Sequence, residues 1–580
     1  MVSSINVLLD SLVIELFRFG ANYCLHLTFL FGISASLFFE NRDLESFLGR
    51  VFASIASTTF VFGFAGFWII PFVFNWWFGA ELVYPNVALW QLLGSLAVSL
   101  ATFFLLRRHL SPAINVLKDK LTKRSELERN KRTDVRTIAD VLPKELFEYD
   151  AAKYIDLDKG IFVGMNDNSK PSYIPLELWQ KSHAQLVGTS GAGKGVAAQV
   201  LLAQAIAADE GVFVLDPKND EWAAHALKSE CIKRNKPFHL IDLNSEQYQL
   251  DFLSGMTAAE LEELFIAGFS LAEKGEAADF YRIEDRRSAR LVANCMKQGD
   301  TLRSLFSGDV AQSVATKAAG FFGKLEELAL MNSINAVAGL DLADIVQSGG
   351  CVYIVGSMRN SRVITMQRML TVRIIQLAER RDRVKEKPRP IAVFLDEFKY
   401  HISKSALEGL GAARDKGVHF ILAHQSIADL HDCPADVNGD AVQGSTVENT
   451  NIKIVYRLKD PETALWLARM SGTILVDDET RKTSRTSGLS EVIDGERTVR
   501  QAERYFVDEN MLLKLPDSCA FVFTGDLPFS SYIKPPYAQK QPLELYQAPE
   551  QVEQEEFDPL AGLDEQPEEL DPLAGLDEAK

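Results

Sequence analysis

A glycine-rich segment, GTSGAGKG at residues 188–195, constrains the fold of this chain more than any other feature. A cradle for an anion needs converging backbone N–H groups, and glycine allows this because it lacks a Cβ and tolerates positive φ. The residues HAQLV (183–187) before it predict a short strand, and residues 195–209 after it predict an Ala-rich helix. Strand, loop and helix together predict a phosphate-binding loop for a nucleoside triphosphate such as ATP.

The predicted nucleotide site consists of this loop and the start of the helix, whose dipole favours an anion. Lys194 occupies the position whose ammonium contacts the outer phosphates, so we expect it to take part in catalysis. The expected nucleotide-binding residues are Gly188, Thr189, Ser190, Gly191, Ala192, Gly193, Lys194, Gly195 and Val196.

One position departs from the general pattern. The residue after the lysine is usually Ser or Thr, whose hydroxyl binds Mg²⁺, but here it is Gly195. Thr189 and Ser190 lie on the far side of the loop and do not easily replace that hydroxyl. Either the metal is held without it, or the site binds nucleotide and turns it over poorly.

A second motif, IAVFLDEF at 391–398, predicts the hydrolytic part of the site. Ile391 to Leu395 form an apolar run that is typical of a buried parallel strand. Asp396 at its end is expected to reach Mg²⁺ through water, and Glu397 to orient or deprotonate the attacking water. The alternative, two carboxylates that cap a helix, explains Asp396 but not the pairing with a lysine loop.

Two further residues are candidates for catalysis. The strand predicted at 417–425 ends in Gln425, where a polar sensor of the γ-phosphate is expected; the alternative is a surface glutamine. The helix predicted at 406–417 carries Arg414, which is placed to enter the site of a neighbouring subunit. An exposed helix arginine is an equally open interpretation of Arg414.

The order of patterns indicates an α/β fold with several domains, because 580 residues exceed one domain and strands alternate with helices. We expect a nucleotide-binding domain in two parts, 141–251 and 346–540. Residues 252–345 lack strand patterning, so we predict an all-helical insert between the two parts.

Apolar segments precede this body and predict N-terminal transmembrane helices. The spans are expected at 19–39, 51–78 and 86–106, each long enough to cross a bilayer. The basic stem at 107–140 places the bulk of the chain in the cytoplasm, by the positive-inside rule, and three spans place the N-terminus outside. Residues 5–19 are alternatively an amphipathic helix on the membrane surface.

The end of the chain differs in kind. Residues 541–580 hold thirteen acidic side chains and one lysine, and DPLAGLDE occurs at 558–565 and again at 571–578. We predict a disordered acidic tail whose repeats dock an adaptor or accessory protein; the alternative is a solubilising tail. With a formal charge of −18, any contact of the chain with nucleic acid requires a local basic ring.

In this order, the motifs resemble the type IV secretion coupling proteins, the TraG/TraD-type conjugative coupling ATPases of the FtsK/HerA-like ring ATPase superfamily. The resemblance rests on GKGV after a strand, VLDPKND (214–220), ADFYR (278–282), FLDEF (394–398), AARDKGVHFILAHQS (412–426) and NTNIKIVYRLKDPETA (449–464). It implies a RecA-like nucleotide-binding domain and roles for Lys194, Asp396, Glu397, Gln425 and Arg414. Many members of this branch carry Gly after the lysine, so Gly195 is then a family trait.

The resemblance also implies a function. The expected protein is a multi-pass ATPase of the bacterial inner membrane, a homo-hexamer that uses ATP and Mg²⁺. It would recruit relaxase-bound single-stranded DNA, the relaxosome, to the other type IV secretion channel subunits, and drive or gate DNA transfer. The alternatives are a membrane receptor with little ATPase, a coupling protein for protein effectors, and an FtsK-like translocase of double-stranded DNA.

Overall fold

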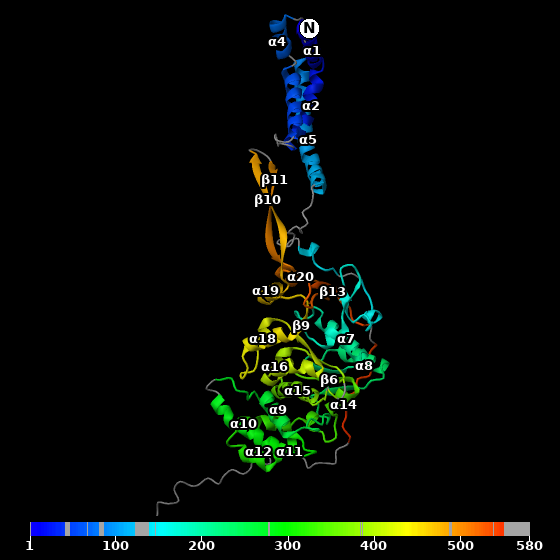
Figure 1. Cartoon of the computed structure of the whole chain (residues 1–580), viewed down its shortest axis with the longest axis vertical. Coiled ribbons are helices and arrows are strands. Elements are labelled where there is room, and N and C mark those ends of the chain that lie inside the picture. Colours follow the sequence, from blue (N-terminus) through cyan, green and yellow to red (C-terminus); the bar gives the residue numbers. More distant parts are fainter. Residues whose placement is uncertain are drawn as a thin grey trace, which may run out of the picture. The chain divides into compact units, whose positions relative to one another are not determined.

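The computed structural model divides the chain into two compact units, Met1–Glu126 and Leu127–Lys580 (Figure 1). The domain boundaries predicted within the second unit stay a prediction. The structure describes residues 2–40, 47–65, 68–79, 86–121, 138–144, 147–275, 279–382, 384, 387–486, 490–536 and 539–549.

The first unit is helical in its described parts. A five-residue π-helical turn, Val61–Ala65, interrupts the second of the predicted spans. The helices are α1 Val2–Asn22, α2 Cys24–Glu40, α3 Phe47–Phe60, α4 Ile69–Phe78 and α5 Leu89–Leu121.

Helix α5 is long and apolar enough to cross a membrane over Leu89–His109. Its large apolar side chains are exposed, with Trp90 at 72% and Phe104 at 62%. A bent pair, Ile14–Asn22 with Cys24–Phe39, counts as a second candidate span if the pair is one span, although the two parts meet at 84°. One or two apolar helices therefore suit a membrane anchor, and the third span and the multi-pass topology stay predictions.

Small and hydroxyl-bearing residues join the helices of this unit. Ser34 and Thr59 are joined by a hydrogen bond of 2.9 Å, and Ser95 donates to the carbonyl of Leu25 at 2.8 Å. Gly63 approaches Thr28 so closely that a Cβ on the glycine would lie 2.8 Å from the Thr28 nitrogen. Close backbone approach and interhelical hydrogen bonds are how helices associate in a bilayer, where hydrophobic burial gives no driving force.

The second unit is built around a mixed sheet of eleven strands among the described residues. The strands from β9 to β5 are parallel, and the four strands on the other side of β9 pair antiparallel. In spatial order the strands are β2 Pro171–Ile174, β1 Ile161–Met165, β13 Phe529–Tyr532, β12 Cys519–Phe523, β9 Thr450–Val455, β3 His183–Val187, β8 Val418–His424, β7 Ile391–Leu395, β4 Gly211–Asp216, β6 Gly350–Val355 and β5 Phe238–Asp242.

Both faces of the parallel strands are buried, which explains their continuous apolar runs. In β4, Phe213 and Leu215 join one apolar cluster, while Val212 and Val214 join another on the opposite face. This alternation follows from the two-residue period of a strand. The predicted strands at 183–187 and 391–395 have the bounds that the apolar runs indicate.

Helices cover each face of the sheet. Helices α7 and α8 contribute to the cluster that contains Val212, whereas α9, α15, α16 and α18 contribute to the cluster that contains Phe213. The covering helices are α6 Leu176–Gln180, α7 Lys194–Ala207, α8 Ala223–Lys233, α15 Ser361–Glu379, α16 Lys404–Ala413, α17 Ile427–His431, α18 Gly439–Asn449, α19 Pro461–Met470 and α20 Glu509–Lys514.

In the described part of the segment predicted as a helical insert, the named secondary-structure elements are helices joined by turns and loops. In Figure 1 its green helices lie together at one end of the second unit. Phe265, Phe269 and Phe321 pack ring against ring in its core. The helices are α9 Ala258–Phe269, α10 Asp279–Asn294, α11 Leu302–Ser307, α12 Asp309–Val314, α13 Ala319–Ala329 and α14 Leu342–Ser348.

Sequence patterns did not predict an antiparallel ribbon formed by β10 Thr473–Thr486 and β11 Ser490–Tyr505. The two strands pair with each other and form a sheet separate from the main one. Their sequence mixes charged and polar residues without the apolar alternation that marks a half-buried strand.

The edge strand β5 is covered by residues that we expected to belong to the disordered tail. Leu545 forms a parallel bridge with Leu240, and the Tyr546 nitrogen donates to the Leu240 carbonyl at 2.8 Å. The Tyr546 ring lies 5.5 Å from the ring of His239. Residues 541–549 therefore belong to the folded body, because they pair with an otherwise open sheet edge. The repeats at 558–565 and 571–578 lie outside the described residues.

We predict that removal of residues 539–580 destabilises the second unit by about 2 kcal/mol, because it exposes the β5 edge and the contacts of Tyr546. Removal of residues 551–580 alone should leave the unfolding temperature unchanged. Thermal unfolding of the two truncated chains measures the difference. Equal unfolding temperatures would contradict the role of residues 539–549 as an edge cover.

Candidate nucleotide site

The phosphate loop joins β3 to α7, and its glycines have backbone angles that other residues rarely adopt. Gly191 has φ 79° and Gly193 has φ 124°. Tyr456, directly after β9, backs the loop: a Cβ on Gly193 would lie 2.9 Å from the Tyr456 ring. The Thr189 nitrogen donates to the Arg457 carbonyl at 2.9 Å. Alanine is thus excluded at Gly193 by both strain and space.

Lys194 is buried, with 7% of its surface exposed, and its ammonium donates to the carbonyls of Gly188 and Thr189 within the loop. Burial and the neighbouring Lys218 lower the pKa of Lys194 to about 8. Glu397, Asp396 and Asp429 act on this ammonium electrostatically, but no ion pair between described residues includes Lys194, and a phosphate group would supply a direct anionic partner.

Asp396 and Glu397 follow β7, which is two strands away from β3 in the sheet. Glu397 is nearly buried and has φ 48° and ψ 64°, the left-handed conformation. This conformation costs on the order of 1–3 kcal/mol for a residue with a side chain, and such strain concentrates at functional sites. The backbone carbonyl of Asp396 is bonded to His401 Nε2 at 3.0 Å, which holds the turn.

A lysine that we did not predict as a site residue joins the two carboxylates. Lys218, in the turn after β4, lies 3.3 Å from Asp396 Oδ2 and forms a close ion pair with Glu397 Oε1. The backbone nitrogen of Lys218 also donates to Asp216 Oδ1 at 2.9 Å. This hydrogen bond ties the turn to the end of β4. The segment VLDPKND could have indicated Lys218 as a site residue. A lysine two residues after the end of a parallel strand lies at the same edge of the sheet as the phosphate loop and Asp396.

The two carboxylates are electrostatically different. Burial raises the pKa of Asp396, and Lys218 only partly opposes this rise. Burial also opposes ionisation of Glu397, but the hydrogen bonds from Lys218 and Gln425 outweigh it and hold the pKa of Glu397 below its ordinary value. Glu397 is therefore the carboxylate that stays ionised most readily, as an acceptor of a proton from water requires.

Gln425 lies beside these groups. Its Nε2 donates to Glu397 Oε1 at 2.9 Å, and its backbone nitrogen donates to Asp429 Oδ2 at 2.8 Å. The carbonyl of His424, the last residue of β8, accepts a hydrogen bond from the Gly188 nitrogen at 3.3 Å. His424 at the end of β8 therefore contacts the phosphate loop, and the next residue, Gln425, contacts Glu397.

Arg414 lies apart from this group within one chain. It follows α16 and precedes β8, at the amino end of the parallel strands. Burial lowers the pKa of His183, at the beginning of β3, to about 4, and the charge of Arg414 adds a little to this lowering. The length of β8, roughly 23 Å at about 3.3 Å per residue, separates this end from Gln425. Arg414 is exposed. Its expected place in the nucleotide site of a neighbouring subunit stays a prediction.

The residues at this edge fit a magnesium-bound nucleotide. Among the described residues there is no cluster of three side chains that holds a metal alone. Mg²⁺ with a nucleotide needs only one or two carboxylates, because phosphates and waters complete its shell. Asp396 would provide one such carboxylate, and its Oδ2 lies 3.3 Å from the ammonium of Lys218.

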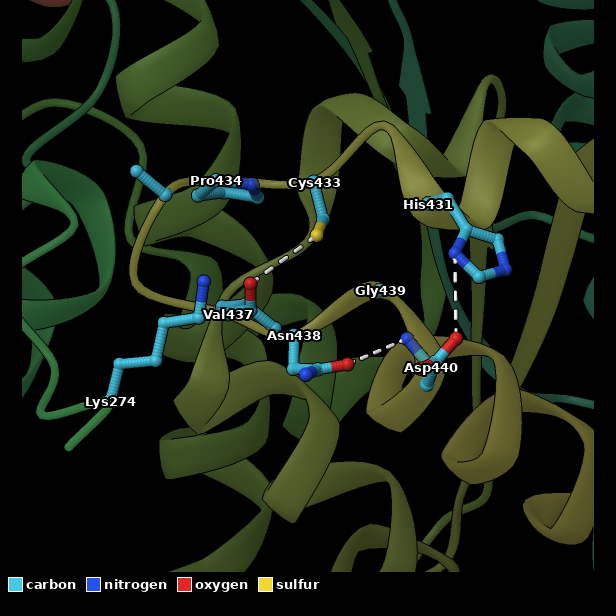
Figure 2. A pocket seen from close by; sticks show the side chains of 9 residues that line it. Lys274, His431, Cys433, Pro434, Val437, Asn438, Gly439 and Asp440 are labelled. Carbon is cyan, nitrogen blue, oxygen red and sulfur yellow. Dashed lines mark hydrogen bonds and ion pairs between the residues drawn. The ribbon is translucent and has the colours of Figure 1, made fainter. Parts of the chain in front are cut away.

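A separate open pocket of about 330 Å³ shares no residue with the predicted nucleotide site (Figure 2). It is lined by Lys274 and by the loop from His431 to Asp440, where His431 Nδ1 lies 3.7 Å from Asp440 Oδ1. Burial raises the pKa of the Cys433 thiol, which makes it a poor nucleophile. This pocket has no features of a catalytic site.

Part of this chain matches a known protein family. Residues 390–517 match the family described as "TraM recognition site of TraD and TraG". Mobilization protein A of Escherichia coli is 29% identical over 359 residues, which cover 61% of this chain and 66% of that protein, a little under two thirds of its length. The resemblance to the TraG/TraD coupling family is confirmed.

The fold of this TraG/TraD-like chain is similar to that of solved coupling proteins. The unbound bacterial conjugative coupling protein TrwBdeltaN70 has a TM-score of 0.50 at 15% identity, covering 70% of this chain and 96% of that chain. The plasmid coupling protein TrwB in complex with ADP and Mg²⁺ has a TM-score of 0.49 at 14% identity, covering 69% and 98%. The first of these two likenesses confirms the predicted α/β fold.

Because the pKa of Lys194 is low, we predict that nucleotide binding at pH 8 is accompanied by proton uptake. The uptake should be on the order of half a proton per site. Below pH 8 the free lysine is already an ammonium; near pH 8 part of it is neutral, and bound phosphate restores the charge. Calorimetry of ADP binding in two buffers of different ionisation enthalpy measures this uptake. Lys194→Arg should abolish it because guanidinium does not titrate there; unchanged uptake in that variant would contradict the assignment.

Proposed function

We propose that this chain is an inner-membrane ATPase that acts as the coupling protein of a type IV secretion or conjugation system. The observation that supports this most is the meeting of Lys194, Asp396, Glu397 and Gln425 at one edge of a coupling-protein fold. Such an edge, at the carboxyl ends of parallel strands, is where nucleotides bind in open α/β sheets. The names of similar proteins, a conjugative coupling protein and a mobilization protein, support the same assignment.

The proposed reaction is transfer of the terminal phosphoryl group of ATP to water. The loop N–H groups and Lys194 would hold the phosphates, and Asp396 would hold the metal. Mg²⁺, when bound, neutralises charge on the phosphates. Glu397 Oε1 accepts a hydrogen bond from the attacking water and takes its proton, and Gln425 keeps that oxygen oriented.

The proposed cargo is single-stranded DNA with its relaxase, and the proposed assembly is a homo-hexamer. In a ring, Arg414 of one subunit would reach the nucleotide site of its neighbour. Within one chain, Arg414 lies at the sheet edge opposite its own nucleotide site. The match of residues 390–517 to the TraM recognition site family supports a docking role for a TraM-like accessory protein on this part of the chain. The acidic repeats of the tail, outside the described residues, are a second proposed docking segment.

Two substitutions separate nucleotide binding from hydrolysis. Lys194→Ala should weaken ATP binding and abolish turnover, since it removes the phosphate-facing charge. Glu397→Gln should retain ATP binding within a few-fold but lower turnover by about 10²–10⁴, the usual contribution of a general base. Fluorescent-nucleotide titration and phosphate release measure the two effects, with Lys181→Ala, at an exposed lysine directly after α6, as the control. Unreduced turnover in Glu397→Gln would remove Glu397 from its role.

Arg414 is tested by mixing two inactive variants. Arg414→Ala and Lys194→Ala should each lack turnover alone, while a 1:1 mixture should recover about a quarter of the activity, because some interfaces pair an intact loop with an intact arginine. Arg469→Ala, at the exposed end of α19, is the matched control and should retain full activity. Full activity of Arg414→Ala alone would contradict action across the interface.

A further inference from the structure

The position after the phosphate-loop lysine has a carboxylate beside it. Gly195 lies in the first turn of α7 and is exposed. A Cβ on Gly195 would lie 3.4 Å from Asp220 Oδ2, an ordinary contact distance. The hydroxyl of a Ser or Thr is one bond from Cβ, so Asp220 Oδ2 borders the space that the missing metal-binding hydroxyl would take.

The carboxylate of Asp220 is held in place by its other oxygen. Oδ1 accepts hydrogen bonds from the nitrogens of Trp222 at 2.9 Å and Ala223 at 2.8 Å, at the beginning of α8. The Asp220 nitrogen donates to Asp216 Oδ2 at 2.6 Å. Among the hydrogen bonds of the described residues none is made to Asp220 Oδ2, so this oxygen is available to a ligand.

We propose that Asp220 replaces the missing hydroxyl and binds the Mg²⁺ that accompanies the nucleotide. The proposal rests on the nucleotide-binding function proposed above. Carboxylate oxygens are preferred Mg²⁺ ligands, and one or two of them with substrate phosphates are the usual protein contribution. Asp396 is the second carboxylate, and Lys218, between Asp216 and Asp220 in the turn, already places a cation against it.

The replacement has an electrostatic consequence. A hydroxyl is neutral, whereas the Asp220 carboxylate adds a full negative charge beside the phosphate cradle. Without metal, this charge repels the nucleotide; with metal, it attracts the ion. Nucleotide affinity should therefore depend strongly on Mg²⁺, and this dependence should come from Asp220.

The test uses the full-length protein, with Mn²⁺ as a spectroscopic probe and ADP as the nucleotide. In the Asp220→Asn variant we expect the Mn²⁺ affinity of the protein–ADP complex, measured by electron paramagnetic resonance, to fall about tenfold or more. ADP affinity in the presence of EDTA should stay equal or increase, because a repelling charge is gone. Asn retains a side-chain oxygen that accepts the hydrogen bonds from the nitrogens of Trp222 and Ala223. The unfolding temperature of the variant should therefore equal that of the wild-type protein.

Two further variants make the test specific. Glu221→Gln removes the same charge from the next residue, which is exposed, and should leave Mn²⁺ affinity unchanged. Gly195→Ser in the Asp220→Asn background supplies the hydroxyl and should restore Mn²⁺ affinity, since the space for its Cβ is adequate.

The outcomes are distinct. Unchanged Mn²⁺ affinity in Asp220→Asn, with normal ADP binding, overturns the role of Asp220 and leaves the proposed function standing. A loss of Mn²⁺ affinity that Gly195→Ser rescues supports it, even if the wild-type protein does not hydrolyse ATP. Absence of ADP binding by the wild-type protein overturns both proposals.

Discussion

The common direction of strands β4, β7, β8 and β3 is the constraint on which the site depends. Because these strands are parallel and adjacent, their carboxyl ends meet at one edge, and segments about 200 residues apart in sequence come together there. Each strand contributes one element: the phosphate loop, the two carboxylates, Gln425, and the turn with Lys218 and Asp220. The same direction places Arg414 at the opposite edge.

Charge balance at this edge explains how buried ionisable groups coexist. Glu397 is buried and Lys218 is about one third exposed, so the ion pair compensates part of the cost of burying the Glu397 carboxylate. A magnesium-bound nucleotide brings both a cation for the carboxylates and anions for the lysines. Such a ligand would compete with Lys218 for the carboxylates of Asp396 and Glu397.

Sequence patterns predicted the fold and the positions of the phosphate loop and the Asp396 strand, because buried parallel strands and glycine-rich loops have strong local signals. The Asp396 strand and the phosphate loop lie where they were expected. The contact of Lys218 with Glu397 was missed because it depends on which strands are neighbours in the sheet. Strands β4 and β7 are adjacent in space but far apart in sequence, so local patterns do not reveal their pairing. Residues 541–549 were wrongly predicted to be disordered for a related reason. Their composition is typical of a disordered tail, and their order depends on pairing with the open edge of β5.

The central claim, that this site drives a motor acting on single-stranded DNA, is tested most directly by the steady-state rate of ATP hydrolysis of the full-length protein in lipid nanodiscs. The rate is compared without DNA, with single-stranded DNA and with duplex DNA of the same length. The account predicts that single-stranded DNA raises the rate several-fold and that duplex DNA does so less. Equal rates in all three conditions would contradict a DNA-coupled motor.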